Sequence, residues 1–576
     1  MFKQVIRLLL RIKPAIKYCL IYGCVALTII ISSNFIWIDS FHYLHVELSP
    51  TIAHASIKQR PKNKNKLSKK QRIELLTYAK SLTQTGHEKL ARGESEAALN
   101  MWQDAAKIYQ HLDDKIGVAG SLINQSIALQ ELGLYRRSCK TLVSAFKPNS
   151  NICNPSNQLE NSNEELNDVI KAIHQQPDKS IVISGLQTLG DILRMVGNLE
   201  QSELVLTEAL GIANSFNLLS SISDIQLSLG NTQQILFYRQ NSLYNLIALS
   251  NNGMEKINYA NKVLQAGEKA IETFKKNFND SATEVDVIKT KINSLQLLVD
   301  LEKLLNQPSI SEKKEWHKFK EYKEKLIFEL VINEPNFSIL SPIQEIYARI
   351  NLVNILIKEI DNNNNLKIKE AAKKYAKSAL NEAHKLHNKR AEAYASGALG
   401  SLYFHDNQLP LSKKYTEKAS IIAQSILAPD ITYQLLWQLG KIYEKLNDSD
   451  KAIIAYDTAI KNLEIVREDL QSLNPGIRFS FQDNIFPVYQ ELIEILLQES
   501  HDNQKLDKVF EVNSSLQEAE LQNFIQCNRL YFEKPEKTSL NNSSVHNFAG
   551  IIHLVRLKNQ LAIIAKLPKQ FNKYIY

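Results

Sequence analysis

Turn-forming residues are scarce in this chain. Only 18 glycines and 15 prolines occur among its 576 residues. β-Sandwiches, barrels and doubly wound sheets need many tight turns, which these residue types favour. The hydrophobic share of 44% and the charged share of 23% are ordinary for a globular protein, so wholesale disorder is excluded as well. The composition therefore predicts a mainly helical body.

Cysteine is also scarce, and the five cysteines do not form a disulfide framework. Cys19 and Cys24 lie in an apolar run, which leaves Cys139, Cys153 and Cys527. In an oxidising compartment Cys139 and Cys153 can pair, since Cys153 lies in a loop-like Cys-Asn-Pro-Ser stretch. Two unpaired thiols are the alternative, and the sequence leaves both interpretations open.

The formal net charge of +8 is concentrated near the N-terminus. Residues 58–72 carry eight basic residues and no acidic one, whereas residues 73–576 have a net charge of −3. A mildly acidic body offers no basic face to neutralise phosphates, so we expect no nucleic-acid partner. The basic stretch is interpreted as a solvated spacer, with contact to anionic lipid as the alternative.

An uncharged apolar run extends from Tyr18 to Ile38, and five cations and no anion precede it. A helix of about 20 such residues can span a bilayer, and the cations favour a cytoplasmic N-terminus. A cleaved signal peptide is the alternative, because Ala53-His54-Ala55 resembles a cleavage site. We therefore expect export to the extracytoplasmic, periplasmic side of a bacterial membrane, either anchored through residues 18–38 or released after cleavage.

A repeat with a period of 40 follows. Leu189-Gly190 recurs as Leu229-Gly230, and Leu399-Gly400 recurs as Leu439-Gly440. Large apolar residues flank each glycine at helical spacing, Gly or Asn follows in a turn position, and Ala with an aromatic residue marks a return helix. This pattern resembles the tetratricopeptide repeat, whose period is about 34. The longer period implies either lengthened helices or longer connections.

The fold class predicted is all-α: a tetratricopeptide-like α-solenoid of about eight helix pairs, with an N-terminal apolar helix and a short C-terminal β-hairpin. Between residues 241 and 390 the signature is lost, although Ala372, Ala376 and Ala379 still indicate a return helix. An Asn-, Ser- and Pro-rich loop is expected at 147–180. The domains expected are a signal or anchor segment (1–38), a basic spacer (39–78), the repeat array (79–470), a helical linker (471–535) and the start of a further domain (545–576).

The C-terminal part carries a second resemblance. The runs concerned are Asn474-Pro475, RFSF at 478–481, PVYQEL at 487–492 and SLQEAELQNF at 515–524, followed by the β-rich runs AGIIHLV at 549–555 and QLAIIAKLP at 560–568. They resemble the linker and opening hairpin of bacterial proteins that join tetratricopeptide repeats to a caspase-like CHAT peptidase domain. In that family the catalytic His and Cys lie far downstream, and neither has a counterpart here. The resemblance therefore implies a chain truncated near the start of the CHAT domain, with no catalytic residue.

Other chemistry is not indicated. Cys527 lies in a helical stretch, and nothing pairs it with His546 or His553 as a nucleophile requires. His384 and His387 share a helix face without a further ligand at metal-site spacing. No phosphate-binding glycine loop, His-Glu-x-x-His or Gly-x-Ser-x-Gly motif occurs. We therefore expect no enzymatic activity, no cofactor, no metal and no small-molecule substrate.

Two functions remain open. One is an exported scaffold that binds a protein or peptide partner in the solenoid groove. The other is the non-catalytic half of a caspase-like peptidase whose catalytic part is on another chain or lost. First-helix residues that face away from the return helix would bind the partner, namely Gln187, Asp191, Arg194, Ser401, Phe404, His405, Trp437, Lys441 and Glu444. Trp437 is the strongest candidate, because an aromatic exposed on a groove tends to anchor partners.

Overall fold

The computed structural model describes residues 67–148, 150, 152–153, 162–247, 253–279, 283–305, 316–363, 365–471, 486–498, 503–525, 551–557 and 561–566. Two compact units divide the chain, Met1–Leu75 and Leu76–Tyr576. The described residues of the first unit contain the beginning of α4, and everything below concerns the second. The apolar helix expected at 18–38 lies outside the described residues. Within the described ranges, no helix has both the length and the apolarity to cross a bilayer.

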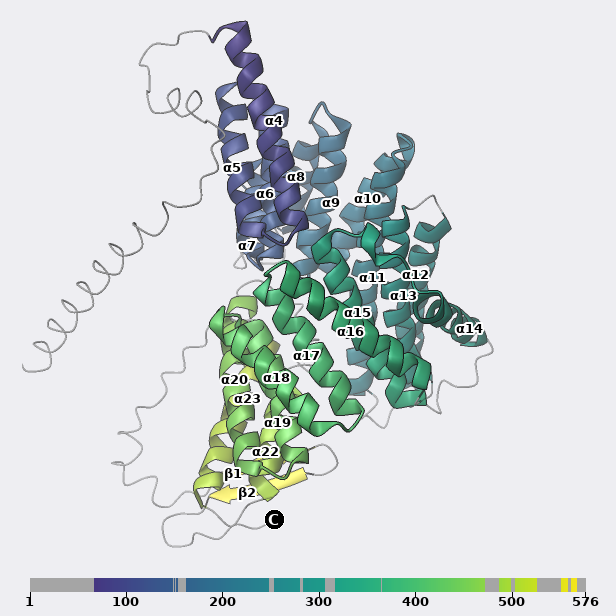
Figure 1. Ribbon diagram of the computed structural model, residues 1–576, viewed down its shortest axis with the longest axis vertical. Coiled ribbons are helices and arrows are strands. Elements are labelled where there is room, and N and C mark those ends of the chain that lie inside the picture. The colour runs from purple at the N-terminus through teal and green to yellow at the C-terminus, as the bar shows by residue number, and fades with distance from the viewer. Residues whose placement is uncertain are drawn as a thin grey trace, which may run out of the picture. The chain divides into compact units, whose positions relative to one another are not determined.

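Paired helices make up the second unit (Figure 1). They are α4 (Lys69–Ala91), α5 (Ser95–His111), α6 (Lys115–Glu131), α7 (Tyr135–Ser144), α8 (Ser162–His174), α9 (Lys179–Met195), α10 (Leu199–Ser215), α11 (Leu219–Ile247), α12 (Gly253–Asn279), α13 (Glu284–Leu305), α14 (Trp316–Ile327), α15 (Pro342–Asn363), α16 (Leu366–Lys385), α17 (Lys389–His405), α18 (Leu409–Ser425), α19 (Pro429–Lys445), α20 (Ser449–Gln471), α22 (Phe486–Gln498) and α23 (Asn503–Ile525). A π-helix, η1 (Phe328–Ile332), and a 3-10 helix, η2 (Phe337–Ile339), join α14 to α15. Each helix packs most closely on its neighbours in the sequence. This confirms the all-α, tetratricopeptide-like solenoid.

Lengthened helices account for the period of 40. The helices α9, α10, α17, α18 and α19 each contain 17 residues. Three-residue turns separate α9 from α10 and α10 from α11, so that α11 begins at Leu219, one full period after the start of α9 at Lys179. Of the two explanations for the long period, the structure therefore supports longer helices, with the connections kept short.

The signature glycines mark the closest approach within a helix pair. A Cβ added to Gly190 would lie 2.5 Å from Leu206 Cγ, and one added to Gly440 would lie 2.4 Å from Tyr456 Cε1. In both cases the obstructing residue follows the glycine by 16 positions, and the same spacing joins Gly86 to Trp102 and Gly400 to Thr416. The first helix thus carries glycine because the second helix places a side chain against its backbone.

A buried hydroxyl fixes the same pairs at a second point. The Ser202 hydroxyl donates to the Gly190 carbonyl over 2.7 Å, and the Ser412 hydroxyl donates to the Gly400 carbonyl over 2.8 Å. Donor and acceptor are separated by 12 positions, as are Ser138 and the Ser126 carbonyl in the α6–α7 pair. All three serines are fully buried. Each bond satisfies a polar group that would otherwise destabilise the core.

The turns adopt the left-handed backbone that the sequence predicts. Gly93, Gly133 and Gly197 have φ angles of 77°, 74° and 77°, and Asn407 and Asn447 have φ angles of 56° and 57°. Each lies between the first and second helix of a pair. Glycine and asparagine adopt this conformation at the least steric cost.

The middle of the chain keeps the helix pairing with longer helices. The helices α11 and α12 contain 29 and 27 residues. The predicted return helix is α16, and Ala372, Ala376 and Ala379 on it are completely buried. The hydrophobic core is continuous from α11 to α17.

The loop expected at 147–180 is wrong for part of its length, because α8 (Ser162–His174) lies within it. Leu166, Val169, Ile170 and Ile173 follow helical spacing and are buried. Their stripe is short, and the Asn- and Ser-rich stretch before it obscures it. Just before α8, Cys153 forms a disulfide with Cys139 of α7.

The predicted C-terminal hairpin is present and docked on helices. Strands β1 (Ile551–Arg556) and β2 (Leu561–Lys566) pair antiparallel, with Leu554 opposite Ile563. On one face, Val555 and Ile564 join the core formed by α19, α20, α22 and α23. On the other face, Leu554 and Ile563 remain 59% and 47% exposed. Strands that are apolar on both faces are typical of sheets covered on both sides.

Candidate functional site

Three first helices carry the nine residues predicted to bind a partner. They are Gln187, Asp191 and Arg194 on α9, Ser401, Phe404 and His405 on α17, and Trp437, Lys441 and Glu444 on α19. All are at least partly exposed to solvent. Their contacts with the chain itself differ between the three helices.

On α9 the charged residues neutralise each other. The Arg194 guanidinium donates to Asp191 Oδ1 over 2.9 Å, and the two side chains are only 14% and 19% exposed. Ser228 of α11 donates to the other Asp191 oxygen over 3.1 Å. This acid–base pair therefore also links one repeat to the next.

On α17 the aromatic residue faces a lysine. Lys445, at the end of α19, places its ammonium 4.1 Å from the centre of the Phe404 ring. His405 packs edge-on against the same ring at 5.7 Å. A cation held over a ring is stabilised by the ring's quadrupole.

On α19, Trp437 is half-buried and bonded within the chain. Its indole N–H donates to Glu491 Oε2 over 2.6 Å, and Lys441 Nζ lies 3.7 Å from its ring centre. Lys441 also pairs with Glu491 at 3.4 Å. Burial raises the pKa of the Glu491 carboxyl, and the Lys441 ammonium opposes that shift. The freely exposed indole that the sequence suggested is therefore covered in part by α22.

Glu444 belongs to the same group of side chains. The Tyr456 hydroxyl donates to Glu444 Oε2 over 3.0 Å. Burial raises the pKa of the Tyr456 phenol, and the Glu491 and Glu444 carboxylates raise it further. Glu491 was not among the predicted residues, because its helix was interpreted as a linker.

A second group of side chains comes from repeats that are distant in the sequence. We call it the tyrosine cluster, and it consists of Tyr135 at the start of α7, Tyr347 on α15, Tyr394 on α17 and Tyr433 on α19. The Tyr347 and Tyr394 rings meet edge to face at 6.0 Å. All four tyrosines are half-buried. None was predicted from the sequence.

Charged groups surround the tyrosine cluster. Arg390 at the start of α17 pairs with Asp430 at the start of α19, and its guanidinium lies 5.8 Å from the Tyr394 ring centre. Glu131, the last residue of α6, interacts electrostatically with both Tyr135 and Tyr347. Arg194 is near enough to Tyr135 to oppose the rise in its pKa, so one predicted residue adjoins the cluster.

The tyrosine cluster is partly desolvated. Burial raises the pKa of all four tyrosine phenols, although each ring is still partly accessible. Burial also raises the pKa of the Glu131 carboxyl, whose side chain is exposed.

A close backbone contact brings the distant repeats together. In the turn between α4 and α5, Gly93 adopts a φ of 77°. A Cβ there would lie 2.7 Å from Asn388 Nδ2 and 2.9 Å from Ile343 Cγ1. Asn388 caps α17 and Ile343 lies at the start of α15, so this glycine permits the first repeat to contact the helices that carry Tyr394 and Tyr347.

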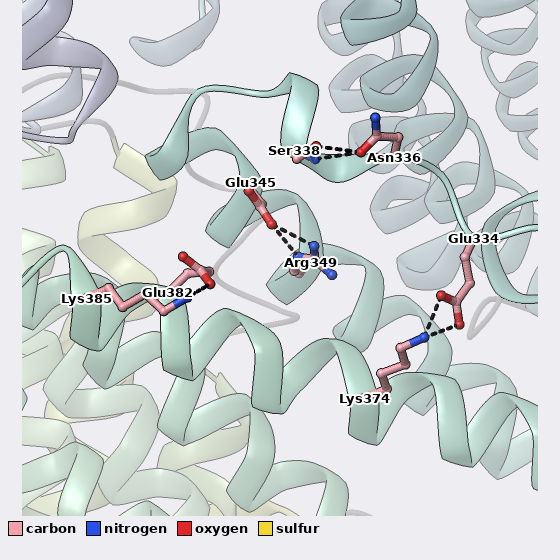
Figure 2. A network of polar contacts seen from close by, with 8 residues as sticks. All are labelled: Glu334, Asn336, Ser338, Glu345, Arg349, Lys374, Glu382 and Lys385. Atoms are coloured by element: carbon pink, nitrogen blue, oxygen red, sulfur yellow. Dashed lines mark hydrogen bonds and ion pairs between the residues drawn. The ribbon is translucent and has the colours of Figure 1, made fainter.

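Polar contacts cluster around α15 and the connection that precedes it (Figure 2). Figure 2 shows Arg349 and Glu345 pointing toward each other on α15, where the guanidinium donates to Glu345 Oε1 over 2.6 Å. Lys374 of α16 donates to both oxygens of Glu334 over 2.7 and 2.6 Å. The Tyr375 hydroxyl donates to the Leu330 carbonyl in η1 over 2.6 Å. The bonds from Lys374 and Tyr375 fix the irregular connection before α15 to α16.

A cavity of about 190 Å³ lies between the ends of α15 and α17 and the start of α16, lined in part by Lys369, Lys373 and Tyr403. No group of three or more metal-ligating side chains occurs within the described part of the chain.

Comparison with known proteins gives distant structural matches only. No family model matches the sequence, and no curated protein is similar to it. The fold is similar to a Rap protein complexed with competence and sporulation factor, at 12% identity and a TM-score of 0.32, covering 78% of this chain and 95% of that one. It is also similar to a signal-transduction ATPase with a tetratricopeptide repeat sensor from Pyrococcus horikoshii, at 13% identity and a TM-score of 0.28, covering 75% and 74%. Yeast Tom70 matches at 13% identity and a TM-score of 0.23, covering 71% and 97%.

Proposed function

We propose that this chain is a tetratricopeptide-like scaffold that binds a protein or peptide partner. The observation that supports this most is the convergence of α7, α15, α17 and α19 on the partly buried tyrosine cluster. Tyrosine supplies a large, rigid contact area at a low cost in conformational entropy. A stacked array of helix pairs can present such a surface without a conformational change.

A peptide selection tests this proposal. The full-length chain in non-ionic detergent is immobilised, and a random heptapeptide display library is selected against it. Enriched peptides are synthesised, and their Kd is measured for the native chain, for Tyr394→Ala and for Ile421→Ala. Ile421 is the matched control, because it is 68% exposed on the second helix α18.

We expect enriched peptides whose affinity falls about tenfold in Tyr394→Ala, the equivalent of about 1.4 kcal/mol, and is unchanged in Ile421→Ala. A library that yields no enriched peptide contradicts the proposal. Peptides that bind Tyr394→Ala and the native chain equally would place binding elsewhere on the array.

We also propose that the array is exported and stays at the membrane. The charge-free run at 18–38 and the cations before it support this. The Cys139–Cys153 disulfide supports it too, because disulfides persist mainly in oxidising compartments. Protease added to intact cells, or to cells with a permeabilised outer membrane, should degrade the array. Full protection under both conditions would argue against export.

The scaffold is proposed to be non-catalytic, since none of the common catalytic motifs occurs in its sequence. Purified full-length chain should not hydrolyse a fluorogenic peptide pool. Hydrolysis that disappears in Cys527→Ala would overturn this part of the proposal.

A caspase-like assembly is the alternative. Here the chain would be the non-catalytic half of a CHAT peptidase, with its His and Cys on a separate chain. The exposed apolar face of the β1–β2 hairpin favours it, because a sheet apolar on both faces is usually covered on both. Reading the DNA downstream distinguishes the two: a frame that encodes further strands and a His/Cys pair would support the alternative.

A further inference from the structure

The cavity between α15, α16 and α17 has buried apolar walls and an exposed rim. Ile360, Leu402 and Tyr403 line it and are 5%, 4% and 5% exposed. Leu366 and Glu370 also line it and are exposed. Its volume of about 190 Å³ exceeds the roughly 150 Å³ of an apolar cavity that binds benzene. The cavity therefore has room for a small organic ligand with one apolar group.

One cation at the cavity is uncompensated. Lys369 pairs with Asp406 at 3.2 Å, and the Gln408 amide donates to the same carboxylate over 2.5 Å. Lys373 instead places its ammonium 5.2 Å from the centre of the Tyr403 ring, and no carboxylate in the described part of the chain pairs with it. Its charge is therefore available to a ligand.

The next repeat shows why Lys373 differs from its equivalent. One period later, Lys413 lies 5.5 Å from the centre of the Tyr443 ring, so the contact between lysine and tyrosine recurs. There Glu417, one turn further along the helix, pairs with Lys413 at 3.8 Å. The position equivalent to Glu417 beside the cavity is occupied by Lys377. The repeat that contains the cavity therefore lacks the acid that neutralises the equivalent lysine.

A carboxylate at the rim provides the opposite charge. Glu370 precedes Lys373 by three positions on α16, and side chains at this spacing are neighbours on a helix surface. Among the described residues, no cation pairs with Glu370. The lining contains two lysines and two carboxylates, so a ligand with a net charge would leave one of them unmatched. A ligand that carries one charge of each sign matches both Lys373 and Glu370.

We propose that this cavity binds a free apolar α-amino acid in its zwitterionic form. The carboxylate of the ligand pairs with Lys373, and its ammonium pairs with Glu370. Its side chain packs against Leu402 and Tyr403. A peptide terminus carries only one of the two charges, so this ligand is distinct from the partner proposed above. The inference goes beyond the scaffold function and does not depend on the tyrosine cluster.

The test uses L-leucine labelled with ¹³C in its methyl groups, so that detergent signals do not interfere. Kd is measured by isotope-edited NMR for the full-length native chain, Lys373→Met, Lys377→Glu and Lys377→Met. Lys377→Met is the matched control, because Lys377 is exposed on the same helix and does not line the cavity. Unlabelled 4-methylpentanoate, which lacks the ammonium, and 3-methylbutylamine, which lacks the carboxylate, are tested as competitors. Thermal unfolding shows whether each variant remains folded.

We expect L-leucine to bind the native chain with a Kd of about 1 mM, as is ordinary for a ligand of so few atoms. Affinity should fall about tenfold in Lys373→Met, which loses one charged hydrogen bond, and remain unchanged in Lys377→Met. Lys377→Glu restores the acid of the next repeat and should weaken binding by about two- to threefold. Each competitor should bind about tenfold more weakly than unlabelled L-leucine.

Three results would overturn the inference. They are no saturable binding at concentrations about tenfold above the expected Kd, equal Kd values for folded Lys373→Met and Lys377→Met, and displacement by 4-methylpentanoate as effective as by unlabelled L-leucine. If Lys373→Met does not fold, Lys377→Glu decides, and a Kd equal to that of Lys377→Met would overturn the inference. The heptapeptide selection is unaffected by any of these outcomes, so the proposed function stands or falls separately.

Discussion

Trp437 and Glu491 are joined by a hydrogen bond of 2.6 Å, so an aromatic residue of one helix pair is fixed by a carboxylate from the next. Lys441 completes the group, 3.7 Å from the indole centre and 3.4 Å from the Glu491 carboxylate. The helix α22 therefore continues the array beyond α20 as a further packed element. The end of the repeats is a continuous core that includes α19, α20, α22, α23 and the hairpin.

Removing the Glu491 carboxylate should destabilise this end of the array. Glu491→Ala leaves the Trp437 N–H and the Lys441 ammonium without their acceptor, and we expect a loss of about 1–3 kcal/mol. Urea-induced unfolding of the native chain and the variant measures this loss of stability. Glu494→Ala on the same helix provides a comparison. A change below the measurement error in Glu491→Ala would contradict the role of this hydrogen bond.

The same carboxyl should make stability depend on pH. Its pKa is raised in the folded state, chiefly by burial, so the folded state binds the proton more tightly than the unfolded chain does. This contribution is fully present below the unfolded pKa and is lost as pH rises through the folded pKa. In Glu491→Gln the free energy of unfolding should therefore decline less than in the native chain as pH rises from about 4 to 7. Identical pH profiles for the native chain and the variant would be evidence against it.

The glycine at the helix crossing should not tolerate a methyl group. In Gly440→Ala the new Cβ would meet the completely buried Tyr456 ring, and we expect a loss of about 1–3 kcal/mol. Gly211→Ala is the matched control, because no atom lies within 4 Å of its added Cβ. That change, within α10, should stabilise by about 0.5–1 kcal/mol. Equal effects of the two substitutions would show that the crossing is not close-packed.

Breaking the disulfide should weaken the α6–α7 pair and the segment that follows it. Cys139 and Cys153 are separated by 14 positions, and closing a loop of this length stabilises by about 3 kcal/mol in the chain-entropy account. We expect Cys139→Ser to lower the free energy of unfolding. Added reductant should lower the free energy of unfolding of the native chain but not that of Cys139→Ser. Counting the free thiols of the unsubstituted chain after denaturation checks whether the two cysteines are paired. Four or five free thiols in chain purified without reductant would contradict it.

The buried ion triad should be intolerant of losing its cation. Lys323 is 6% exposed at its side chain and lies 3.1 Å from Glu359, which is 1% exposed, and 2.5 Å from Glu302. Lys323→Met removes the cation that faces the buried Glu359 carboxylate and the Glu302 carboxylate, at an expected loss of about 3–5 kcal/mol. Lys325→Met is the control, since its side chain is 64% exposed. Similar unfolding midpoints for the two variants would mean that the triad contributes little.

The sequence predicts those parts of the fold that recur with the period. Leu-Gly pairs one period apart locate α9 and α11, and likewise α17 and α19, because the glycine must meet the second helix at a fixed place. Asn407 and Asn447 mark the turns, because they adopt the left-handed backbone readily. The helix α8 was missed because its stripe, Leu166 to Ile173, is short and follows an Asn- and Ser-rich stretch.

The candidate site was predicted only in part. Arg194 adjoins the tyrosine cluster, but the cluster itself joins Tyr135 to tyrosines more than 200 positions later. Nothing in the repeat pattern relates positions across so many repeats. One signal was available: Arg390 and Asp430 are opposite charges one period apart, so they occupy equivalent positions in adjacent repeats. Trp437 was expected to be open because α22 was interpreted as a linker.

The central claim is that distant repeats form one binding surface, and hydrogen exchange of the full-length chain tests it most directly. Exchange is followed by mass spectrometry with and without a heptapeptide selected against the chain. We predict that the peptide protects amides at the start of α7 and at the starts of α17 and α19 together. Protection confined to a single helix pair, or to segments away from Tyr135 and Tyr394, would contradict the account.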